Sequence, residues 1–428
     1  MRIEIENGFR EVGMNNTSRW LLGLVLLAVV SVSSTAVMAH GDPPAGDEVF
    51  AVDGEWVYLT NFGVMAASWP DQYVCEEAFY ASEDFSIAPL ATDAWVTASR
   101  TTVATTDDGC NFERVRGDLP REPSAIAALP DSGEVAYLVR DEDDVELMYS
   151  DDGGETWSEL AVELEELIPT GVGFLEAGRL VVVAYEADDD IRGAPLITDI
   201  DVDAEERSDF DVDDELRYPE LLDARAGDLL WYAQRDGEVE VRWSRSDDLH
   251  AGDFVASSWP AAGAIAPDGQ RAYLGGIDEQ GRGVFEAMRD EPSQWTEIVD
   301  GHRGMCLAAT DDGRLFVCGH RDDDGHDLAV VDADGELEKL VDFRDLQGYR
   351  SGCGTESDVG GSCPAVWPEL ATALDIEVED REDEAEETMG CRNSSGEPGP
   401  IGGLAVFFGV VGLICYRSQG VESCRSTV

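Results

Sequence analysis

Short apolar runs recur along this chain at a nearly constant interval, and this spacing limits the fold more than any other feature. The runs begin near residues 56, 95, 135, 180, 229, 271 and 314, in steps of 39, 40, 45, 49, 42 and 43 residues. Each run is rich in β-branched and aromatic residues and is bounded by Gly, Asp or Pro, as is typical of a β-strand between turns. A fixed period of about 40–50 residues indicates one four-stranded sheet per repeat, which is the organisation of a β-propeller. We therefore predict an all-β propeller of seven blades over residues 40–365, with six or eight blades as alternatives.

The charge composition excludes one large class of partners. The chain has 29 Lys and Arg residues against 91 Asp and Glu residues, which gives a formal net charge of −62. Because a chain without excess cations cannot displace counterions from phosphates, we exclude a general nucleic-acid binder. Hydrophobic residues still make up 43% of the chain, which is enough for a sizeable core.

The N-terminal segment has the pattern of a secretory signal peptide. An apolar run at residues 20–32 follows Arg19, and small residues lead up to Ala39. A run of this length is too short to span a bilayer comfortably, whereas a preceding cation and a small residue at the cleavage point are typical of an export signal. We predict a signal peptide at residues 1–39 with cleavage after Ala39. Met14 is an alternative start, because the residues before it include three glutamates.

The C-terminal part predicts a stalk followed by a membrane anchor. Residues 366–400 combine a run of carboxylates, which extends a chain by self-repulsion, with a Gly/Ser/Pro stretch around Cys391. Residues 401–416 form an apolar segment, and a short tail at residues 417–428 begins with Arg417. A lone Cys, a Gly/Ser/Pro stretch, an apolar helix and an arginine together resemble the MYXO-CTERM sorting tail of myxobacteria. This resemblance implies processing at Cys391 and attachment to the cell surface; a plain transmembrane tail anchor is the alternative.

Two turn motifs lie 45 residues apart within the repeat. Residues 150–157 (SDDGGETW) match the pattern Ser-x-Asp-x-Gly-x-Thr-Trp at every defined position, and residues 105–112 (TTDDGCNF) match it with Thr, Asn and Phe substituted. Both resemble the Asp-box of BNR, or sialidase-like, propellers, a structural turn whose Asp and Ser/Thr side chains bond the turn's own backbone. The resemblance assigns this role to Ser150, Asp152, Gly154, Thr156 and Trp157 in one turn, and to Thr105, Asp107, Gly109 and Phe112 in the other. It also implies that the aromatic residue packs between neighbouring sheets.

The start of the mature chain narrows this resemblance. The stretches at residues 40–44 (HGDPP), 73–78 (YVCEEA) and 108–112 (DGCNF), together with the C-terminal tail, are similar to those of secreted Asp-box proteins of myxobacterial type. The function of those proteins is not established, so the likeness implies a lineage and a fold without an activity.

The cysteines of the exported body predict a set of disulfides. Six of the nine cysteines lie in this body: Cys75, Cys110, Cys306, Cys318, Cys353 and Cys363. An even number in an oxidising compartment indicates three disulfides, out of fifteen pairings that six cysteines allow. We predict Cys75–Cys110 between the first two blades, Cys306–Cys318 across adjacent strands, and Cys353–Cys363 closing a Gly/Ser loop.

Candidate catalytic residues are few. Sialidase-like hydrolysis needs an arginine cluster that grips a carboxylate, a tyrosine nucleophile with a partner Glu, and an acid Asp. The Phe/Tyr-Arg-Ile-Pro motif of such enzymes is missing before the first turn motif, and residues 217–220 (RYPE) offer suitable residue types only in isolation. We therefore assign no catalytic residue and expect no enzyme activity.

Candidate metal ligands are equally sparse. Asp199, Asp201 and Asp203 begin like a calcium loop, but Ala204 stands where that loop needs glycine, and the alternation of acid and apolar residues favours a half-exposed strand. His320 and His326, together with Asp327, are a second candidate metal site. The alternative is that both histidines lie in solvated loops and bind no metal. We predict no cofactor, with calcium as the alternative.

These observations predict an exported cell-surface propeller that binds or displays a ligand. The expected partner is a protein or a glycan, the membrane is contacted through the C-terminal tail, and the chain is expected to be a monomer. The alternatives are a sialidase-like glycan hydrolase and a factor that assembles envelope complexes. Groups that converge on the central channel separate the first two, because the fold alone does not give the function.

Overall fold

The structure is a computed structural model of the chain. It describes residues 44–377 except for short stretches at 80–84, 100–101, 118–122, 131, 142–143, 165–166, 187–194, 211, 214, 246–252, 257 and 333–334. The predicted signal peptide with its cleavage point after Ala39, Cys391 and the apolar segment 401–416 lie outside these described residues. Among the described helices, none is long and apolar enough to cross a membrane.

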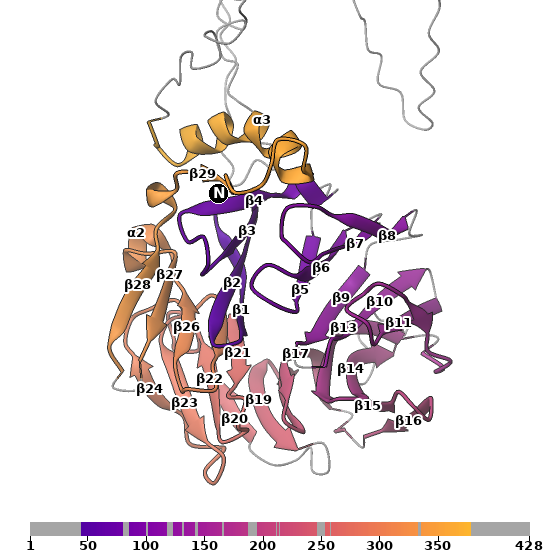
Figure 1. Cartoon of the computed structure of the whole chain (residues 1–428). Coiled ribbons are helices and arrows are strands. Elements are labelled where there is room, and N and C mark those ends of the chain that lie inside the picture. The colour runs from indigo at the N-terminus through magenta and orange to yellow at the C-terminus, as the bar shows by residue number, and fades with distance from the viewer. Residues whose placement is uncertain are drawn as a thin grey trace, which may run out of the picture. The chain divides into compact units, whose positions relative to one another are not determined.

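Seven antiparallel sheets follow one another along the chain, as the repeat predicts (Figure 1). Blade 1 contains β1 (Gly46–Val52), β2 (Glu55–Thr60), β3 (Gly63–Ala66) and β4 (Gln72–Cys75). Blade 2 contains β5 (Phe85–Pro89), β6 (Trp95–Ser99), β7 (Thr102–Thr106) and β8 (Glu113–Gly117). Blade 3 contains β9 (Pro123–Leu129), β10 (Glu134–Asp141), β11 (Asp144–Ser150) and β12 (Ser158–Glu159). Blade 4 contains β13 (Leu167–Glu176), β14 (Arg179–Glu186), β15 (Pro195–Asp201) and β16 (Glu206–Asp209).

The last three blades repeat the same order. Blade 5 contains β17 (Arg217–Arg225), β18 (Asp228–Arg235), β19 (Glu238–Arg245) and β20 (Asp253–Ala256). Blade 6 contains β21 (Ala262–Ile265), β22 (Arg271–Gly275), β23 (Val284–Met288) and β24 (Thr296–Val299). Blade 7 contains β25 (Leu307–Ala309), β26 (Leu315–Cys318), β27 (Leu328–Val331) and β28 (Leu337–Val341). The prediction of a seven-bladed propeller is confirmed.

Each apolar run of the sequence becomes the second strand of a blade. These strands are β2, β6, β10, β14, β18, β22 and β26. The second strand is paired on both sides within its sheet, and both of its faces pack against neighbouring blades, so polar residues are disfavoured along its whole length. Residues 180–184 of β14 and 229–233 of β18 are buried without interruption. The repeat is therefore visible in the sequence because the most buried strand recurs once per blade.

The inner strands carry small residues where they approach one another around the axis. In β13, a Cβ added to Gly171 would lie 2.7 Å from Cβ of Leu221 in β17. A Cβ added to Gly173 would lie 2.7 Å from Cβ of Ala224. Such distances are too short for two carbon atoms, so glycine at these positions sets how closely blades 4 and 5 approach.

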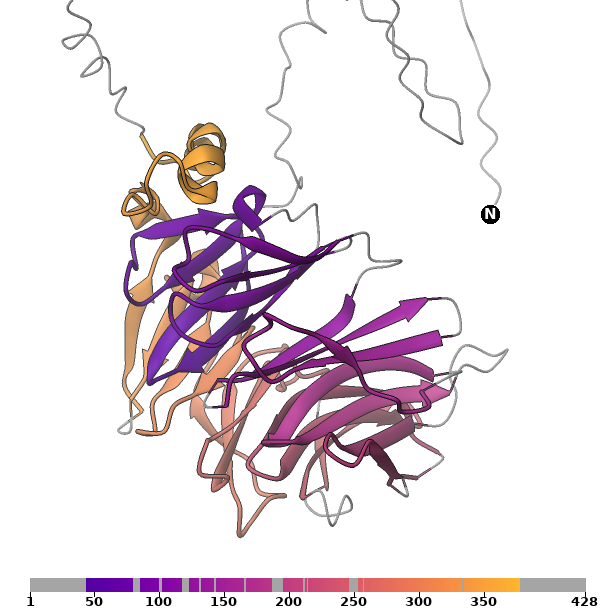
Figure 2. The ribbon, with the colours of Figure 1, turned by 45° about the vertical axis from the view of Figure 1, so that its right-hand side comes forward.

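The C-terminal segment joins the two ends of the ring. All four main strands of each blade come from one continuous stretch of chain, so no blade is completed by a strand from the other terminus. Instead, β29 (Gly348–Tyr349) pairs in parallel with β4, and α3 (Asp358–Ala373) packs on blade 1 (Figures 1 and 2). The ring of Trp367 in α3 lies 6.0 Å from that of Tyr73 in β4. We call residues 346–376 the clasp.

Two disulfides hold the clasp, and both differ from the predicted pairing. Cys75 of blade 1 pairs with Cys363, and Cys110 of blade 2 pairs with Cys353. The predictions Cys75–Cys110 and Cys353–Cys363 are wrong, because they assume that cysteines near in sequence are near in space. The ring instead brings the last residues of the body against the first two blades. The prediction Cys306–Cys318 is confirmed.

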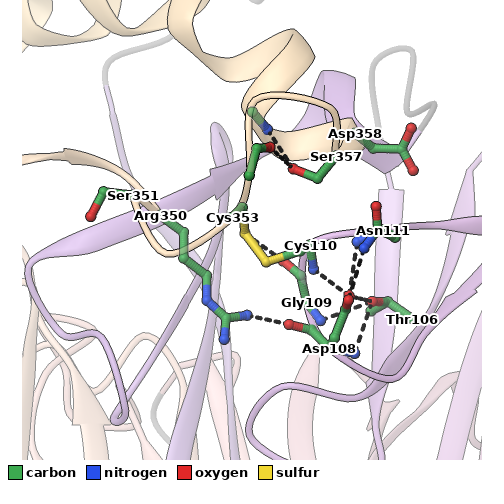
Figure 3. The surroundings of a disulfide bond; sticks show 12 residues. Thr106, Asp108, Gly109, Cys110, Asn111, Arg350, Ser351, Cys353, Ser357 and Asp358 are labelled. Atoms are coloured by element: carbon green, nitrogen blue, oxygen red, sulfur yellow. Dashed lines mark hydrogen bonds between the residues drawn. A yellow bond between two sulfur atoms is a disulfide. The ribbon is translucent and has the colours of Figure 1, made fainter.

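Further contacts around Cys110 and Cys353 fix the clasp to blade 2 (Figure 3). The guanidinium of Arg350 donates a hydrogen bond to the carbonyl oxygen of Asp108 at 2.6 Å. The carboxylate of Asp358 accepts one from the backbone N–H of Phe112 at 2.7 Å. These bonds satisfy backbone groups of the blade-2 turn from a segment more than 240 residues later in sequence.

The helix α3 was not predicted from the sequence. It begins after the N-cap Ser357, whose hydroxyl accepts from the N–H of Gly360 at 3.0 Å. Two glycines and two prolines within its residues obscure the helical pattern. The predicted boundary between body and stalk at residue 366 falls inside this helix, so the folded body continues further than predicted.

Three shorter helices complete the described fold. They are η1 (Glu76–Phe79), α2 (Arg321–Asp324) and η2 (Phe343–Asp345). The first follows β4 and contacts α3, and the other two flank the last strands of blade 7.

Candidate functional site

The seven inner strands enclose a central channel. Its cavity has a volume of about 340 Å³ and is lined by β1, β5, β9, β13, β17, β21 and β25. Most lining residues are Ala, Gly, Val, Ser, Thr, Pro and Leu, because the strands leave little room for larger side chains. The charged residues among the described lining are Glu48, Asp223 and Arg225.

Asp223 is fixed within this wall by backbone donors. Its carboxylate accepts hydrogen bonds from the N–H of Ile265 at 2.7 Å and from the N–H of Ala224 at 2.8 Å. Burial raises the pKa of Asp223, although the positive charge of Arg225 and both hydrogen bonds act in the opposite direction.

Glu48 lies near the start of β1 and keeps solvent-exposed surface inside the channel. The surrounding walls displace much of the bulk water from it, and this desolvation raises the pKa of Glu48 to about 7, with repulsion from Asp223 and Asp47 as further causes. The channel therefore presents a carboxyl group that changes charge near neutral pH. Sequence reasoning missed both carboxylates, since only the ring places the two strands opposite each other.

Among the described lining residues, the channel lacks the arginine cluster that hydrolysis of a sialoside needs. That reaction requires several arginines converging on a carboxylate, and Arg225 is the one arginine among the described lining residues. A Tyr–Glu pair does occur in blade 5, where the hydroxyl of Tyr232 donates to Glu220. Burial and this carboxylate raise the pKa of Tyr232, which keeps its hydroxyl protonated and weakens it as a nucleophile.

The turn at residues 150–157 has the hydrogen bonds that its sequence predicts. The Ser150 hydroxyl accepts from the N–H of Gly154 at 2.9 Å and donates to Asp152 at 2.8 Å. The Asp152 carboxylate accepts from the N–H of Thr156 at 2.8 Å and from its hydroxyl at 2.6 Å. Trp157 packs in a cluster that includes apolar residues of blades 2 and 3. All these bonds stay within the turn, which gives the motif a structural role.

The turn in blade 2 uses different residues from those predicted. Thr106 and Asp108 make its hydrogen bonds: the Thr106 hydroxyl accepts from the N–H of Gly109 at 2.9 Å, and Asp108 accepts from the N–H of Cys110 at 2.8 Å. The assignment of this role to Thr105 and Asp107 is therefore wrong by one position. The blade-2 turn is one residue shorter than the blade-3 turn, so aligning the two on their glycines shifts the preceding side chains.

Phe112 and Gly109 occupy the places predicted for them. Phe112 is buried against Phe79 and Trp95, with ring centroids 5.4 Å and 6.1 Å away. Gly109 has φ of +61°, and an added Cβ would lie 2.8 Å from the Trp95 ring, so a larger residue would be both strained and crowded.

The predicted metal ligands do not converge. Asp199 in β15 pairs with Arg179 of the neighbouring strand β14, and Asp201 accepts the N–H of Ala204 at 2.9 Å in a turn. Asp199 and Asp201 lie in β15, as the strand interpretation of this segment predicts. Within the described residues, no group of three or more His, Cys, Asp or Glu side chains is placed to hold a metal ion.

His326 pairs with a histidine that sequence reasoning overlooked. The Nε2 atoms of His326 and His302 are 2.7 Å apart, and both rings are buried, whereas His320 is exposed. Nδ1 of His302 accepts from the N–H of Gly304 at 3.3 Å, so a neutral His302 carries its proton on Nε2 and donates to His326. Desolvation is the largest cause that lowers the pKa of both histidines. Of the candidate ligands, His320 is thus exposed and His326 buried, and the Asp327 carboxylate accepts a hydrogen bond from the N–H of Phe343 at 2.6 Å.

Comparisons with known proteins found structural likenesses at low sequence identity. No family model matches the chain, and no curated protein matches it. A GH74 enzyme from Niastella koreensis is similar over 65% of this chain and 42% of its own, at 14% identity and a TM-score of 0.42. TolB from Acinetobacter baumannii is similar over 59% of this chain and 61% of its own, at 13% identity and a TM-score of 0.39. Dipeptidyl peptidase 4 from Porphyromonas gingivalis is similar over 71% of this chain and 54% of its own, at 10% identity and a TM-score of 0.46. In each case the chain spans less than two thirds of the other protein.

Proposed function

We propose that this chain is an exported, surface-attached β-propeller of the Asp-box type that binds or displays a ligand and catalyses no reaction. The observation that carries the proposal is the channel lining, in which small residues surround two carboxylates and one arginine. An enzyme needs a nucleophile, a proton donor and charge-stabilising groups within reach of one reacting atom. A propeller that presents a channel with a few charged groups, together with rim loops on a rigid ring, suits recognition instead.

Disulfides support the exported location. Three disulfides in one chain are typical of proteins that fold outside the reducing cytosol. The signal sequence at residues 1–39, the stalk at 366–400 and the Cys391 tail complete a proposed route from secretion to attachment at the envelope. A high negative charge keeps such a surface soluble and free of nucleic acid.

Catalysis is tested with the full-length protein and fluorogenic substrates. The protein is incubated with a methylumbelliferyl sialoside and a methylumbelliferyl β-glucoside between pH 5 and 8, beside the Tyr232→Phe and Glu48→Gln variants. We expect release no faster than in buffer for all three proteins. Turnover by the unaltered protein that either variant removes would overturn the proposal in favour of a glycan hydrolase.

Surface attachment is tested in the producing cell. Intact cells that produce either the unaltered chain or the Cys391→Ala variant are treated with protease, and the propeller is then detected by blotting. We expect the unaltered propeller to be digested from outside. Full protection, with the signal segment still attached to the protein, would overturn the proposed location.

A further inference from the structure

An aromatic patch with one exposed carboxylate lies where blade 5 meets blade 6. We call Tyr218, Glu220, Tyr232 and Trp259 the rim patch. Tyr218 and Glu220 stand at the start of the inner strand β17, Tyr232 is in β18, and Trp259 lies between β20 and β21. The patch is therefore on the face of the propeller at which the inner strands begin.

The backbone is distorted at this point. Tyr218 has φ of +55°, a left-handed conformation that is strained for a non-glycine residue. The pairing of β17 with β18 shifts between Arg217 and Glu220, which is a β-bulge. The hydroxyl of Thr170 in blade 4 donates to the carbonyl of Pro219 at 2.8 Å and holds the bulge in place. Bulges and strained residues of this kind redirect side chains and are concentrated at binding sites.

Trp259 is the described tryptophan with the most exposed position. It is 45% exposed, and its ring contacts Tyr232 at 5.4 Å and Tyr218 at 6.5 Å between centroids, both nearly perpendicular to the indole. The neighbouring Ser258 hydroxyl donates to the carbonyl of Gly276 at 2.6 Å and fixes the loop. The indole is thus supported by two tyrosines while much of its surface faces solvent.

The same fold covers other tryptophans with arginine. Guanidinium groups lie over Trp231, Trp243 and Trp69 at 5.3, 5.1 and 5.1 Å from the ring centroids. Within the described part of the chain, no cation lies over Trp259. A cation over an indole face is attracted by the ring quadrupole, and at an exposed site this strengthens binding about 2–5-fold.

Glu220 supplies the opposite charge beside this ring. Its Oε2 accepts from the Tyr232 hydroxyl, which orients the carboxylate, and its Oε1 has no partner among the described residues. Glu220 is exposed, and the chain around it carries a large net negative charge. The Glu220 oxygen without a described partner and the partly exposed indole of Trp259 together suit a planar cation, which carboxylates bind through charged hydrogen bonds.

We propose that the rim patch binds the guanidinium of an arginine presented by a partner protein, stacked on Trp259 and paired with Glu220. This inference deepens the proposed binding function by naming a partner chemistry. The inference concerns the rim and not the channel. A negative result with the arginine peptide would therefore leave the non-catalytic proposal standing, and turnover in the hydrolysis assay would not by itself decide whether the rim patch binds arginine. A sugar is disfavoured as the occupant because the patch offers few fixed polar groups for several hydroxyls.

The test uses full-length protein labelled with 5-fluorotryptophan and observed by ¹⁹F NMR. The Trp259 resonance is assigned by its loss in Trp259→Phe. The probes are the blocked tripeptide Gly-Arg-Gly and its neutral counterpart Gly-citrulline-Gly, which has nearly the same shape without the charge. Methyl β-D-glucopyranoside is the sugar probe.

We expect the arginine peptide to shift the Trp259 resonance, and the citrulline peptide to bind at least about 2–5-fold more weakly, the ratio that a cation–π contact of this size gives. Glu220→Gln removes the charge at constant shape and should weaken the arginine peptide by a similar factor, while binding weakens as salt rises. Met288→Leu, at another exposed apolar residue, is the matched control and should change nothing.

Three results overturn the proposal. They are equal binding of the two peptides, binding of the arginine peptide that Glu220→Gln leaves intact, and a Trp259 shift caused by the glucoside alone. Trp259→Leu removes the resonance together with the indole, so binding of the arginine peptide to this variant is measured by calorimetry and should be lost, while thermal unfolding checks that the fold is retained.

Discussion

Removing the two clasp disulfides separately and together gives the sharpest test of how the ring is closed. The variants are Cys75→Ala with Cys363→Ala, Cys110→Ala with Cys353→Ala, and all four changes combined. The bonds join residues 288 and 243 apart in sequence. Since one loop contains the other, each bond alone already closes most of the loop that the other closes.

The expected energies follow from this nesting. The two separations, 288 and 243, differ by 45, so with one bond intact the second closes a ring of only about 45 residues. The chain-entropy relation then assigns ~4 kcal/mol to the loss of either bond alone, and ~5.7 kcal/mol to the loss of the last remaining long-range bond. The loss of both should exceed the sum of the two single losses by about 1.6 kcal/mol, which is 3/2 RT times the logarithm of the ratio of loop lengths.

The assay is urea unfolding at neutral pH without reductant, followed by tryptophan fluorescence and circular dichroism. Local effects of replacing buried sulfur occur equally in the single and combined variants and cancel in the cycle, so the coupling isolates the loop entropy. Losses that add to within about 0.3 kcal/mol would refute the nested-loop reasoning. Removal of Cys306–Cys318, which spans 12 residues, is the control and should show no coupling to the clasp.

The remaining predictions concern charge and turns. Glu48→Gln should raise the free energy of unfolding at pH 8 by on the order of 1 kcal/mol, discounted for channel water, and change it little at pH 4. The reason is that the pKa of Glu48 is raised to about 7 in the folded chain, so wild-type stability falls as pH rises from about 4.5 through 7; an equal effect at both pH values would contradict this. The pKa values of His302 and His326 are lowered in the folded chain, so the unfolded chain binds protons at a higher pH than the folded chain does. The free energy of unfolding of the wild type should therefore fall below about pH 6.5, by up to ~1.4 kcal/mol per histidine and pH unit. His302→Gln should make this fall less steep. An unchanged slope in melting temperature against pH would remove the histidine pair as its cause. Thr106→Val should lower the free energy of unfolding by ~1 kcal/mol, whereas Thr105→Val should lower it by less than about 0.5 kcal/mol. If chemical denaturation gives the reverse order, Thr105 and not Thr106 makes the hydrogen bond of the turn.

The sequence by itself predicted the propeller and favoured seven blades, with six or eight left open. Each blade buries its second strand on both faces, so a fully apolar run must recur once per blade, as at 180–184 and 229–233. The turn at Ser150 is equally local, because all its partners lie within seven residues. The Cys306–Cys318 bond joins the residue before β25 to the last residue of β26, and a separation of 12 residues predicts such a bond across adjacent strands.

Only the tertiary structure decided which distant groups meet. Closing the ring brings Cys363 to Cys75 and Glu48 to Asp223, and no periodicity records such pairs because nothing in the intervening chain depends on them. The helix α3 and the pairing of His302 with His326 belong to the same class. Burial leaves a pattern in every repeat, whereas a contact between two single positions is created once, by the closure of the fold.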